Sequence, residues 1–360
     1  MGYIKLPYEG LKAYCTDVFK GYGFTQQESE EIVDVLLRAD LYGIESHGVQ
    51  RLIRYHKAVT GGDIDPKVKP EIIHETPISA IIDSKGGVGQ TIAMKAMRMA
   101  IEKAKNIGAG FVMVKNANHF GIASYYADMA ADADMIGLSF TNSEAIMVPT
   151  YGRRAMIGSN PIALAMPADP IKFSFDAATT VVPRGKLEVY NKKEQPLPHG
   201  WAVDANGKET ANASEVLYNI IHKVGGGILP LGGSQPINGS HKGYGFGMMC
   251  EIFTSILAGG ATSNHCCNGG NAETSQGFIA IDYGMFGDKK EIRARMSTFL
   301  QELRDSDKAE GQDRIYTHGE KEVESTKEKL ANGVPVNEKT DAEMRMIAET
   351  LNLDYSKYFK

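Results

Sequence analysis

Apolar residues recur at helical spacing near the start of the chain and again near its end. Leu11, Tyr14 and Val18 share one face of a predicted first helix. Thr25 and Glu28 then form a capping-box pattern, in which each side chain satisfies a free backbone N–H at the start of a second helix. Further helices are predicted over 46–59, 291–303, 320–332 and 340–351.

The middle of the chain alternates short apolar runs with helical patterns and turns. Residues 186–212 are polar and rich in turn-forming residues. The order of elements is not that of regular βαβ units, so we expect an α/β (α+β) fold with helices at both termini and an inserted middle part. Strands are predicted at 79–83, 110–115, 136–141, 162–167, 173–175 and 276–282, and helices at 91–106, 125–133 and 242–261.

The composition is that of an ordinary globular enzyme, and it narrows the classes of function. Hydrophobic residues make up 42% of the 360 residues, charged residues make up 23%, and the net charge is −5. Nucleic-acid binding is not expected, because no stripe of Lys and Arg is available to bind phosphates. Four cysteines are too few and too scattered for a disulfide framework.

The sequence gives no sign of secretion or of a membrane span. Residues 1–5 lack the apolar core of a signal peptide. The longest apolar run, 243–261, carries Glu251 near its middle, and a carboxylate is costly to bury in lipid. We therefore interpret this run as a helix buried in a soluble protein, and we expect a cytoplasmic location.

A glycine-rich turn lies between a predicted strand and a predicted helix, where many dinucleotide-binding loops occur. The turn is Gly86-Gly87-Val88-Gly89. The fingerprint fails in detail, because Ile92 stands where glycine or alanine is required and no acidic residue ends a second strand about 20 residues later. We interpret the segment as a turn, so any dinucleotide site is expected to be of a non-Rossmann kind.

Three polar residues near the predicted third helix are candidates for substrate binding. His47 and Arg51 are four positions apart, which places them on one face of a helix, and Ser46 lies at its start. A guanidinium group matches a carboxylate, and an imidazole can contact a carbonyl oxygen. The alternative is a capped helix that carries two solvated polar residues.

His119 is the candidate for proton transfer. It follows the predicted strand 110–115 and precedes a helix, and such loops both fix and expose catalytic groups. Because histidine titrates near neutral pH, it can give and take the proton that accompanies hydride transfer. The alternative is a structural histidine with satisfied hydrogen bonds.

Two further residues are candidates for ligand binding, whereas a group of cysteines and histidines is not expected to bind a metal. Asp176 ends a strand and begins a run of small residues, which suits either a ligand or an ordinary turn. Lys242 opposes the dipole at the start of a helix, which suggests an anionic partner. Because Cys266 and Cys267 are adjacent rather than spaced, we expect no zinc site with His241 or His265.

Taken together, these segments resemble one known family, the malate/L-lactate dehydrogenase-like oxidoreductases. The family includes ureidoglycolate and sulfolactate dehydrogenases, diketogulonate reductases and cyclic imino acid reductases. The matching segments run in order through most of the chain: ADLYGIESHGVQRL (39–52), KGGVGQ (85–90), NANHFGIASYY (116–126), IGSNPIALAMP (157–167), FDAATT (175–180), PHGWAVDANGKET (198–210), LPLGG (229–233), HKGYGFG (241–247) and GFIAIDYGMF (277–286).

The resemblance implies a homodimeric oxidoreductase that interconverts 2-hydroxyacids and 2-ketoacids with NAD or NADP, and we favour NAD. It implies that a middle domain with a mostly antiparallel sheet, 121–280, binds the cofactor. A helical segment, 1–62, and a substrate and dimerisation domain, 63–120 plus 281–360, would complete the chain. In this family's pattern His119 matches the catalytic histidine, Ser46, His47 and Arg51 match the substrate pocket, and Ser143, Asp176, Ala177, Ala178, Lys242, Gly319 and Glu320 match cofactor contacts.

Some segments depart from the family pattern. DAATT replaces the commoner DMATS, residues 234–240 lengthen the approach to Lys242, and His318-Gly319 stands where Pro-Gly is usual. Residues 263–275 do not follow the consensus expected for the family. Overall similarity favours malate and oxaloacetate as substrates. Lactate, ureidoglycolate, sulfolactate and cyclic imino acids remain alternatives, as does a metal-dependent hydrolase or lyase from another class.

Overall fold

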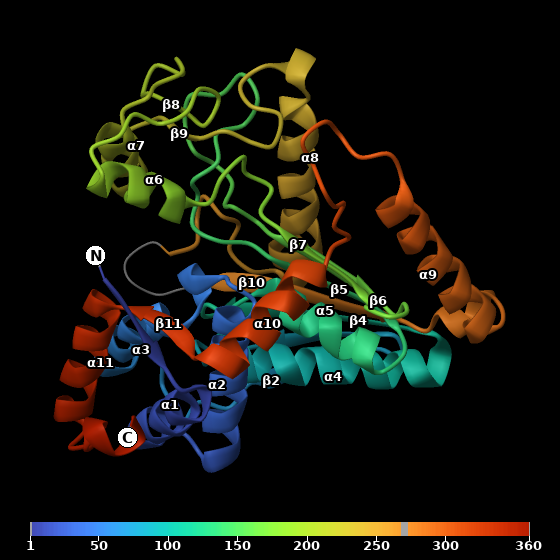
Figure 1. The fold of residues 1–360 in the computed structure, drawn as a ribbon, viewed down its shortest axis with the longest axis horizontal. Helices are drawn as coiled ribbons and strands as arrows, with labels where there is room; N and C mark the ends of the chain where they lie inside the picture. The colour runs from blue at the N-terminus through green and yellow to red at the C-terminus, as the bar shows by residue number, and fades with distance from the viewer. Residues whose placement is uncertain (1, 268–272, 360) are drawn as a thin grey trace.

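A seven-stranded sheet organises the computed structural model, which describes residues 2–267 and 273–359 (Figure 1). The strand order is β2-β3-β4-β10-β5-β6-β7. Only β3 and β4 pair in parallel, and the other neighbours are antiparallel, which confirms the mostly antiparallel sheet that was predicted. The strands are β2 (Glu71–Glu75), β3 (Ser79–Asp83), β4 (Ala109–Ala117), β5 (Ile136–Thr141), β6 (Ile162–Met166), β7 (Phe173–Ala177) and β10 (Thr274–Ile281).

The central strand, β10, is buried on both faces. Successive side chains of a strand point to opposite faces, so Phe278 joins the core under α4 (Gly89–Ile107) and α5 (Ala123–Asp132). Its neighbour Ile279 joins a smaller core on the other face, together with Cys250 of α8 (Ser240–Glu251). Two layers of helix therefore enclose the sheet, with α4 and α5 below it and α8 above it in Figure 1.

The two ends of the chain build one helical body beside the sheet. Strand β1 (Tyr3–Leu6) pairs with β11 (Val334–Asn337), and the hydroxyl of Tyr14 donates to the carbonyl of Met344 over 2.6 Å. These contacts join residues more than 300 positions apart in the sequence. The helices of this body and its neighbours are α1 (Tyr8–Gly21), α2 (Gln26–Leu41), α3 (Leu52–Thr60), α10 (Glu320–Asn332) and α11 (Glu338–Thr350), while α9 (Lys289–Asp305) lies at the far edge (Figure 1).

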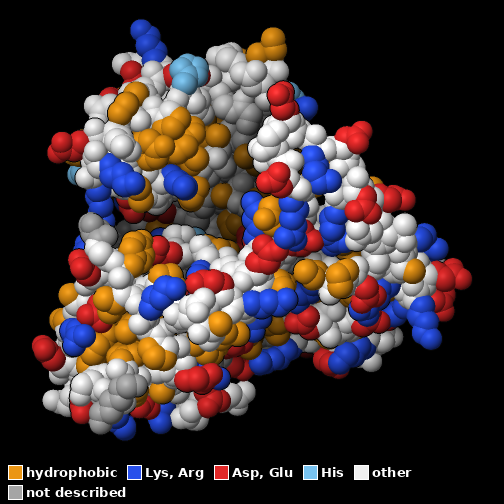
Figure 2. Space-filling view, in the orientation of Figure 1, with side chains coloured by type: hydrophobic (Ala, Val, Ile, Leu, Met, Phe, Trp, Pro, Cys, Tyr) orange, Lys and Arg blue, Asp and Glu red, His pale blue; other side chains and the backbone are white. Residues whose placement is uncertain are grey.

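A third body lies above the sheet and has a small core of its own. Leu187, Val216 and Ile228 are fully buried in that core. Figure 2 shows the molecule hollowed between this body and the helical body below it. The elements of the upper body are α6 (Arg184–Lys192), β8 (Ala202–Val203), α7 (Ala213–His222) and β9 (Gly227–Ile228).

Most predicted elements are confirmed, and three predictions need correction. The predicted helix 46–59 is broken: Glu45–His47 and Val49–Arg51 are separate 3-10 turns, and α3 begins only at Leu52. The predicted helix 242–261 changes at its middle, because α8 gives way to a π-helical turn, η4 (Ile252–Ile256). The turn-rich segment 186–212 also contains most of helix α6.

The strands β1, β2 and β11 and the helix α7 were not predicted. Strand β2 is exposed along its whole length, so its sequence has no alternation of buried and exposed positions to reveal it. The seven-stranded sheet takes strands from 71–177 and from 274–281 and therefore joins segments assigned to different domains. The division into domains stays a prediction.

We expect Phe278→Ala to destabilise the protein by roughly 3–5 kcal/mol, because the cavity would open in the core beneath the sheet. Its ring contacts Tyr126 at a centroid distance of 5.4 Å and Phe120 at 6.2 Å. The matched control is Phe286→Ala, since that side chain is 72% exposed. Urea unfolding measures both free energies, and equal losses for the two variants would contradict this description of the core.

Candidate active site

A short loop at the end of β4 presents His119. The amide of Asn118 donates to the carbonyls of Gly86, over 2.8 Å, and Gly87, over 3.2 Å. A Cβ on Gly89 would overlap the backbone carbonyls of Asn118 and His119, so glycine is required there. The glycine-rich segment is therefore a turn, as predicted, and it supports the loop that carries His119.

Tyr55 and Gln90 fix the His119 ring through its Nδ1. The Tyr55 hydroxyl lies 2.7 Å from Nδ1 of His119, and the Gln90 amide donates to the same hydroxyl over 2.6 Å. Tyr55 and Gln90 are almost completely buried. The phenol can donate to Nδ1 or accept from it, so this contact holds the ring in either protonation state. Nε2 has no hydrogen-bond partner among the described residues, which leaves it for a substrate.

Ser46, His47 and Arg51 meet beside His119, although not on one helix face. The rings of His47 and His119 stack at 5.4 Å, and the Ser46 hydroxyl lies 2.9 Å from Nδ1 of His47. The Nε of Arg51 donates to the Ser46 carbonyl over 2.5 Å. These contacts, rather than the helical spacing proposed from the sequence, bring the three side chains together.

Asp40 explains why the chain cannot form a continuous helix here. Its carboxylate accepts from the N–H of Val49 over 2.8 Å, and a Cβ on Gly48 would overlap that carboxylate. Gly48 therefore adopts an extended conformation that ends the first turn. Burial raises the pKa of Asp40 to about 7.

The electrostatic environment keeps both histidines neutral. Burial lowers the pKa of His119 well below its usual 6.5, and the charges of Arg54 and Arg51 lower it further. Burial and the same two arginines lower the pKa of His47 to about 4. No acidic residue in the described part of the chain forms an ion pair with Arg51 or Arg54. The cluster is thus a cationic pocket around a neutral imidazole, which suits an anionic ligand.

The third body contributes charge to this cluster. Burial and the charge of Arg54 lower the pKa of Arg51. Among the smaller effects, the charge of Glu188 raises this pKa and that of Arg184 lowers it. Both of these residues belong to α6. The pocket therefore lies between the helical body and the third body.

Ser143 and Asp176, two residues expected to contact a cofactor, have partners within the chain. The N–H of Ser143 donates to Oδ1 of Asn160 over 3.1 Å, and its hydroxyl accepts from the N–H of Ser159 over 3.1 Å. Asp176 accepts from the N–H of Ser124 over 2.8 Å, at the start of the helix that follows His119. Burial raises the pKa of Asp176. The last strand residue, Ala177, and Ala178 follow it directly.

Lys242 lies in the first turn of α8, as predicted. It lines a cavity of about 330 Å³, together with the loop 236–239 and Phe246. The helix start has no side-chain cap, so its first N–H groups have no side-chain acceptor. The N–H groups of Ser240 and Lys242 already donate to backbone carbonyls, so the ammonium group of Lys242 is the donor here that best fits a phosphate of a dinucleotide.

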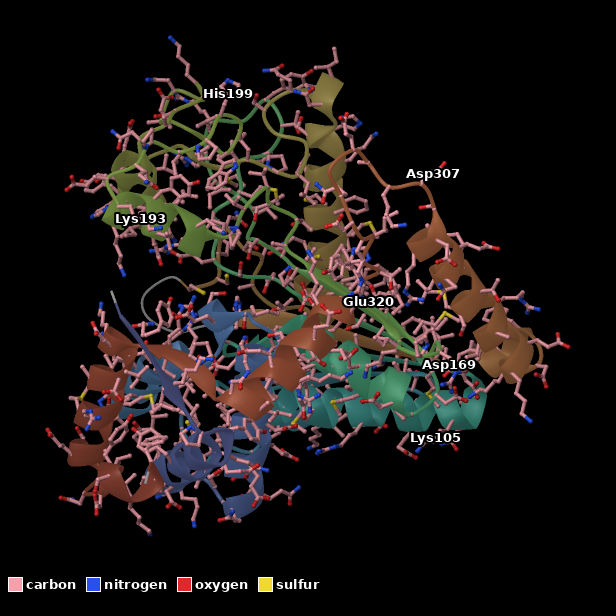
Figure 3. The ribbon with its side chains drawn as sticks, in the orientation of Figure 1. Lys105, Asp169, Lys193, His199, Asp307 and Glu320 are labelled. Atoms are coloured by element: carbon pink, nitrogen blue, oxygen red, sulfur yellow. The ribbon has the colours of Figure 1, made fainter. Side chains whose placement is uncertain are left out.

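Glu320 is held by internal contacts. It lies at the start of α10, beside β7 (Figure 3), and both of its carboxylate oxygens are engaged. One accepts from Arg304 over 2.6 Å, and the other accepts from the N–H of Thr317 over 3.0 Å. Gly319, immediately before it, has a φ of +102°, which favours glycine.

No helix in the described part of the chain has the length and apolarity needed to cross a membrane.

Comparisons with known proteins assign the family. A sequence profile described as malate/L-lactate dehydrogenase matches residues 6–345. The chain belongs to the malate/L-lactate dehydrogenase family. It is a dehydrogenase acting on CH–OH donors, as predicted, and this family uses a nicotinamide cofactor.

Several relatives match over nearly their whole length. A malate dehydrogenase of Pyrococcus abyssi is 41% identical over 98% of this chain and 96% of that protein. An L-sulfolactate dehydrogenase of Methanocaldococcus jannaschii is 36% identical over 98% of both. The crystal structure of malate dehydrogenase from Entamoeba histolytica superposes with a TM-score of 0.94 at 33% identity, covering 98% of this chain and 99% of that one.

Three residues of the pocket were not predicted from the sequence: Tyr55, Gln90 and Arg54. A signal for Tyr55 was present, because it lies one helical turn after Arg51. Gln90 directly follows the glycine-rich turn, whose function was sought only in nucleotide binding. Its contact with Tyr55 joins two helices and has no pattern in the sequence.

We expect Tyr55→Phe to lower turnover by roughly tenfold, since one net hydrogen bond that orients His119 would be lost. Tyr22→Phe is a matched control, because the Tyr22 hydroxyl also lies 2.7 Å from Nδ1 of a histidine, His56, outside the pocket. Steady-state kinetics of both variants, with their melting temperatures, test the assignment. Equal activity in the two variants would show that the contact with His119 is only structural.

Proposed function

We propose that this dehydrogenase interconverts malate and oxaloacetate, with His119 as the acid and base. The observation that carries the proposal is the pairing of a neutral imidazole with two guanidinium groups that have no ion-pair partner among the described residues. A substrate with one carboxylate needs only Arg51. A second anionic group, as in malate, would match Arg54. The malate dehydrogenases of two Pyrococcus species, 41% and 39% identical to this chain, support the same choice.

Each residue of the pocket would have a separate role in binding the substrate, orienting it or transferring the proton. Arg51 binds the carboxylate next to the reacting carbon, and Ser46 and His47 orient the carbonyl oxygen. In the oxidative direction the neutral His119 accepts the hydroxyl proton at Nε2, while Tyr55 holds Nδ1. In the reductive direction the protonated ring returns that proton to the carbonyl oxygen. A positioned acid or base of this kind contributes about 10²- to 10⁴-fold in rate.

The nicotinamide cofactor supplies or accepts the hydride when it is bound, and we favour NAD over NADP. Lys242 and the start of α8 would hold its phosphates. Ser143, Asp176, Ala177, Ala178 and Gly319 are further proposed contacts. Because both carboxylate oxygens of Glu320 already have partners in the chain, its role would be to shape this segment rather than to donate a ligand oxygen.

We further propose a cytoplasmic homodimer. Helix α8 and the turn after it expose Phe246, Met249, Ile252 and Ile256, each between 43% and 59% of its surface. Contiguous apolar surface of this kind is typical of an interface.

L-sulfolactate is the second candidate substrate. It carries a sulfonate where malate carries its second carboxylate, so Arg54 would match either anion. The relative from Methanocaldococcus jannaschii, 36% identical, is a sulfolactate dehydrogenase. Lactate lacks the second anion and does not use Arg54.

We expect the purified protein to oxidise NADH with oxaloacetate faster than with pyruvate or sulfopyruvate. His119→Asn should lower that turnover by about 10²- to 10⁴-fold, because the positioned proton donor is removed. His56→Asn serves as the control for the loss of a histidine. The measurement is nicotinamide absorbance with NADH and NADPH in parallel, and near-wild-type turnover of a folded His119→Asn protein would disprove the assignment.

We expect Arg54→Gln to raise the KM for oxaloacetate roughly tenfold or more, as a charge-assisted hydrogen bond to the second anion is lost. The KM for pyruvate, which lacks that anion, should change little. Arg295→Gln is the control, because the Arg295 side chain is 67% exposed on α9. If both ketoacids responded equally to Arg54→Gln, the residue would not bind the second anion.

A further inference from the structure

Two adjacent cysteines lie in contact in the turn that follows η4. The sulfur atoms of Cys266 and Cys267 are 3.6 Å apart and share a hydrogen bond. Cys266 is fully buried, whereas Cys267 is partly exposed and has a φ of +60°. The pair belongs to the segment 263–275, which departs from the family pattern, and the proposed reaction does not use it.

The two sulfurs of this pair differ in reactivity from the other cysteines. Burial raises the pKa of Cys15 and of Cys250, which makes both thiols inert. The hydrogen bond between the two sulfurs lowers the pKa of Cys267, and so do the charges of Arg54 and Lys223, while burial and the charge of Glu144 act in the opposite direction. The same hydrogen bond raises the pKa of Cys266. Cys267 is therefore the expected nucleophile, and Cys266 is its nearest thiol.

The charge of Arg54 on one side, and a chain of hydrogen bonds on the other, connect the pair to the proposed site. The charge of Arg54 acts on Cys267 and also on His119. On the other side, the Cys266 thiol donates to the carbonyl of Ser263 over 3.6 Å. The Ser263 hydroxyl bonds the buried carboxylate of Glu251 and lies 3.3 Å from Oδ1 of Asn160.

Asn160 completes the connection. Its Oδ1 accepts from the N–H of Ser143, the residue proposed to contact the cofactor, and its Nδ2 donates to Glu251 over 2.8 Å. A shift of the cysteine turn would therefore act on Ser143 through Ser263 and one amide side chain.

We propose that Cys266 and Cys267 form a reversible oxidation site for peroxides and that its disulfide form has reduced dehydrogenase activity. The Cys267 thiolate attacks one oxygen of hydrogen peroxide, the O–O bond breaks, and hydroxide leaves, so that Cys267 becomes a sulfenic acid. The Cys266 sulfur then attacks the Cys267 sulfur, the S–O bond breaks, and water leaves as the S–S bond forms. Two thiols and one peroxide thus give one disulfide and two waters.

The disulfide has a physical route to the active site. An S–S bond is about 2.05 Å long, so the two sulfurs must approach one another and the turn must rearrange. The Cys266 thiol also loses the proton that it donates to Ser263. Because Ser263 shares partners with Asn160, the Ser143 segment should shift, and the thiolate charge beside Arg54 disappears.

The test treats the full-length protein with hydrogen peroxide, blocks the remaining thiols under denaturing conditions, and reads each cysteine by peptide mass spectrometry. We expect the peptide with Cys266 and Cys267 to lose two hydrogens and to escape alkylation, while Cys15 and Cys250 are alkylated. Activity in the same samples should fall several-fold and return with dithiothreitol. Because the peptide masses do not depend on the substrate, they test the oxidation of the two cysteines even if the proposed function is wrong.

Two variants make the result specific. Cys267→Ser should keep its activity through the same treatment, and Cys266→Ser should accumulate a sulfenic acid at Cys267 that dimedone traps. Cys266→Ala replaces Cys266→Ser if the buried hydroxyl prevents folding. The proposal is overturned if the pair stays reduced while Cys15 or Cys250 is oxidised, if Cys267→Ser loses activity as fast as the wild type, or if the disulfide forms without loss of activity.

Discussion

A partly buried imidazole held neutral near two guanidinium groups is the constraint on which the rest of the site depends. Burial and the charges of Arg54 and Arg51 lower the pKa of His119, and none of the described carboxylates neutralises the two arginines by an ion pair. Arg51 is partly buried and Arg54 is exposed, so the repulsion between their like charges is greatest on the Arg51 side of the imidazole. Binding an anionic substrate relieves that repulsion, so the pocket selects its ligand by charge.

The fold supplies the rigid support that this cluster needs. His119 follows β4, whose neighbour β10 is buried on both faces of the sheet, and Phe120 packs against Phe278 of that strand. Tyr55 comes from α3 and Gln90 from the start of α4, so three elements position one ring. The third body adds α6 from the other side of the hollow, which places the pocket between separate cores.

Local patterns in the sequence predicted the elements that depend on residues close to one another along the chain. The strand before His119 has an apolar run, and the capping box of α2 forms with both of its contacts, so both could be predicted. The break at Gly48 could not, because it depends on the carboxylate of Asp40 on another helix. Strands β1 and β11 pair across almost the whole chain, and each is only four residues long, too short for its pattern to predict a strand.

The roles of the site residues differ in how far the sequence could define them. The sequence placed a histidine, His119, in a loop that follows a strand. Only its position near Arg51 and Arg54 in the structure supports proton transfer to an anionic substrate. Glu320 matched a cofactor position by order along the chain, yet its carboxylate turned out to be engaged by Arg304 and Thr317. The two cysteines were considered only for zinc, and their contact with each other suggests a different reaction.

The most direct test of the account is the pKa of His119, measured by NMR on protein with labelled histidines and assigned with His119→Asn. Since the positive neighbours disfavour the imidazolium, the resonance in the free protein should titrate only below about 6.5, the ordinary value. A bound dicarboxylate inhibitor should neutralise those neighbours and move the titration to higher pH. A free-protein pKa at or above 6.5, or one that the inhibitor leaves unchanged, would contradict the central claim.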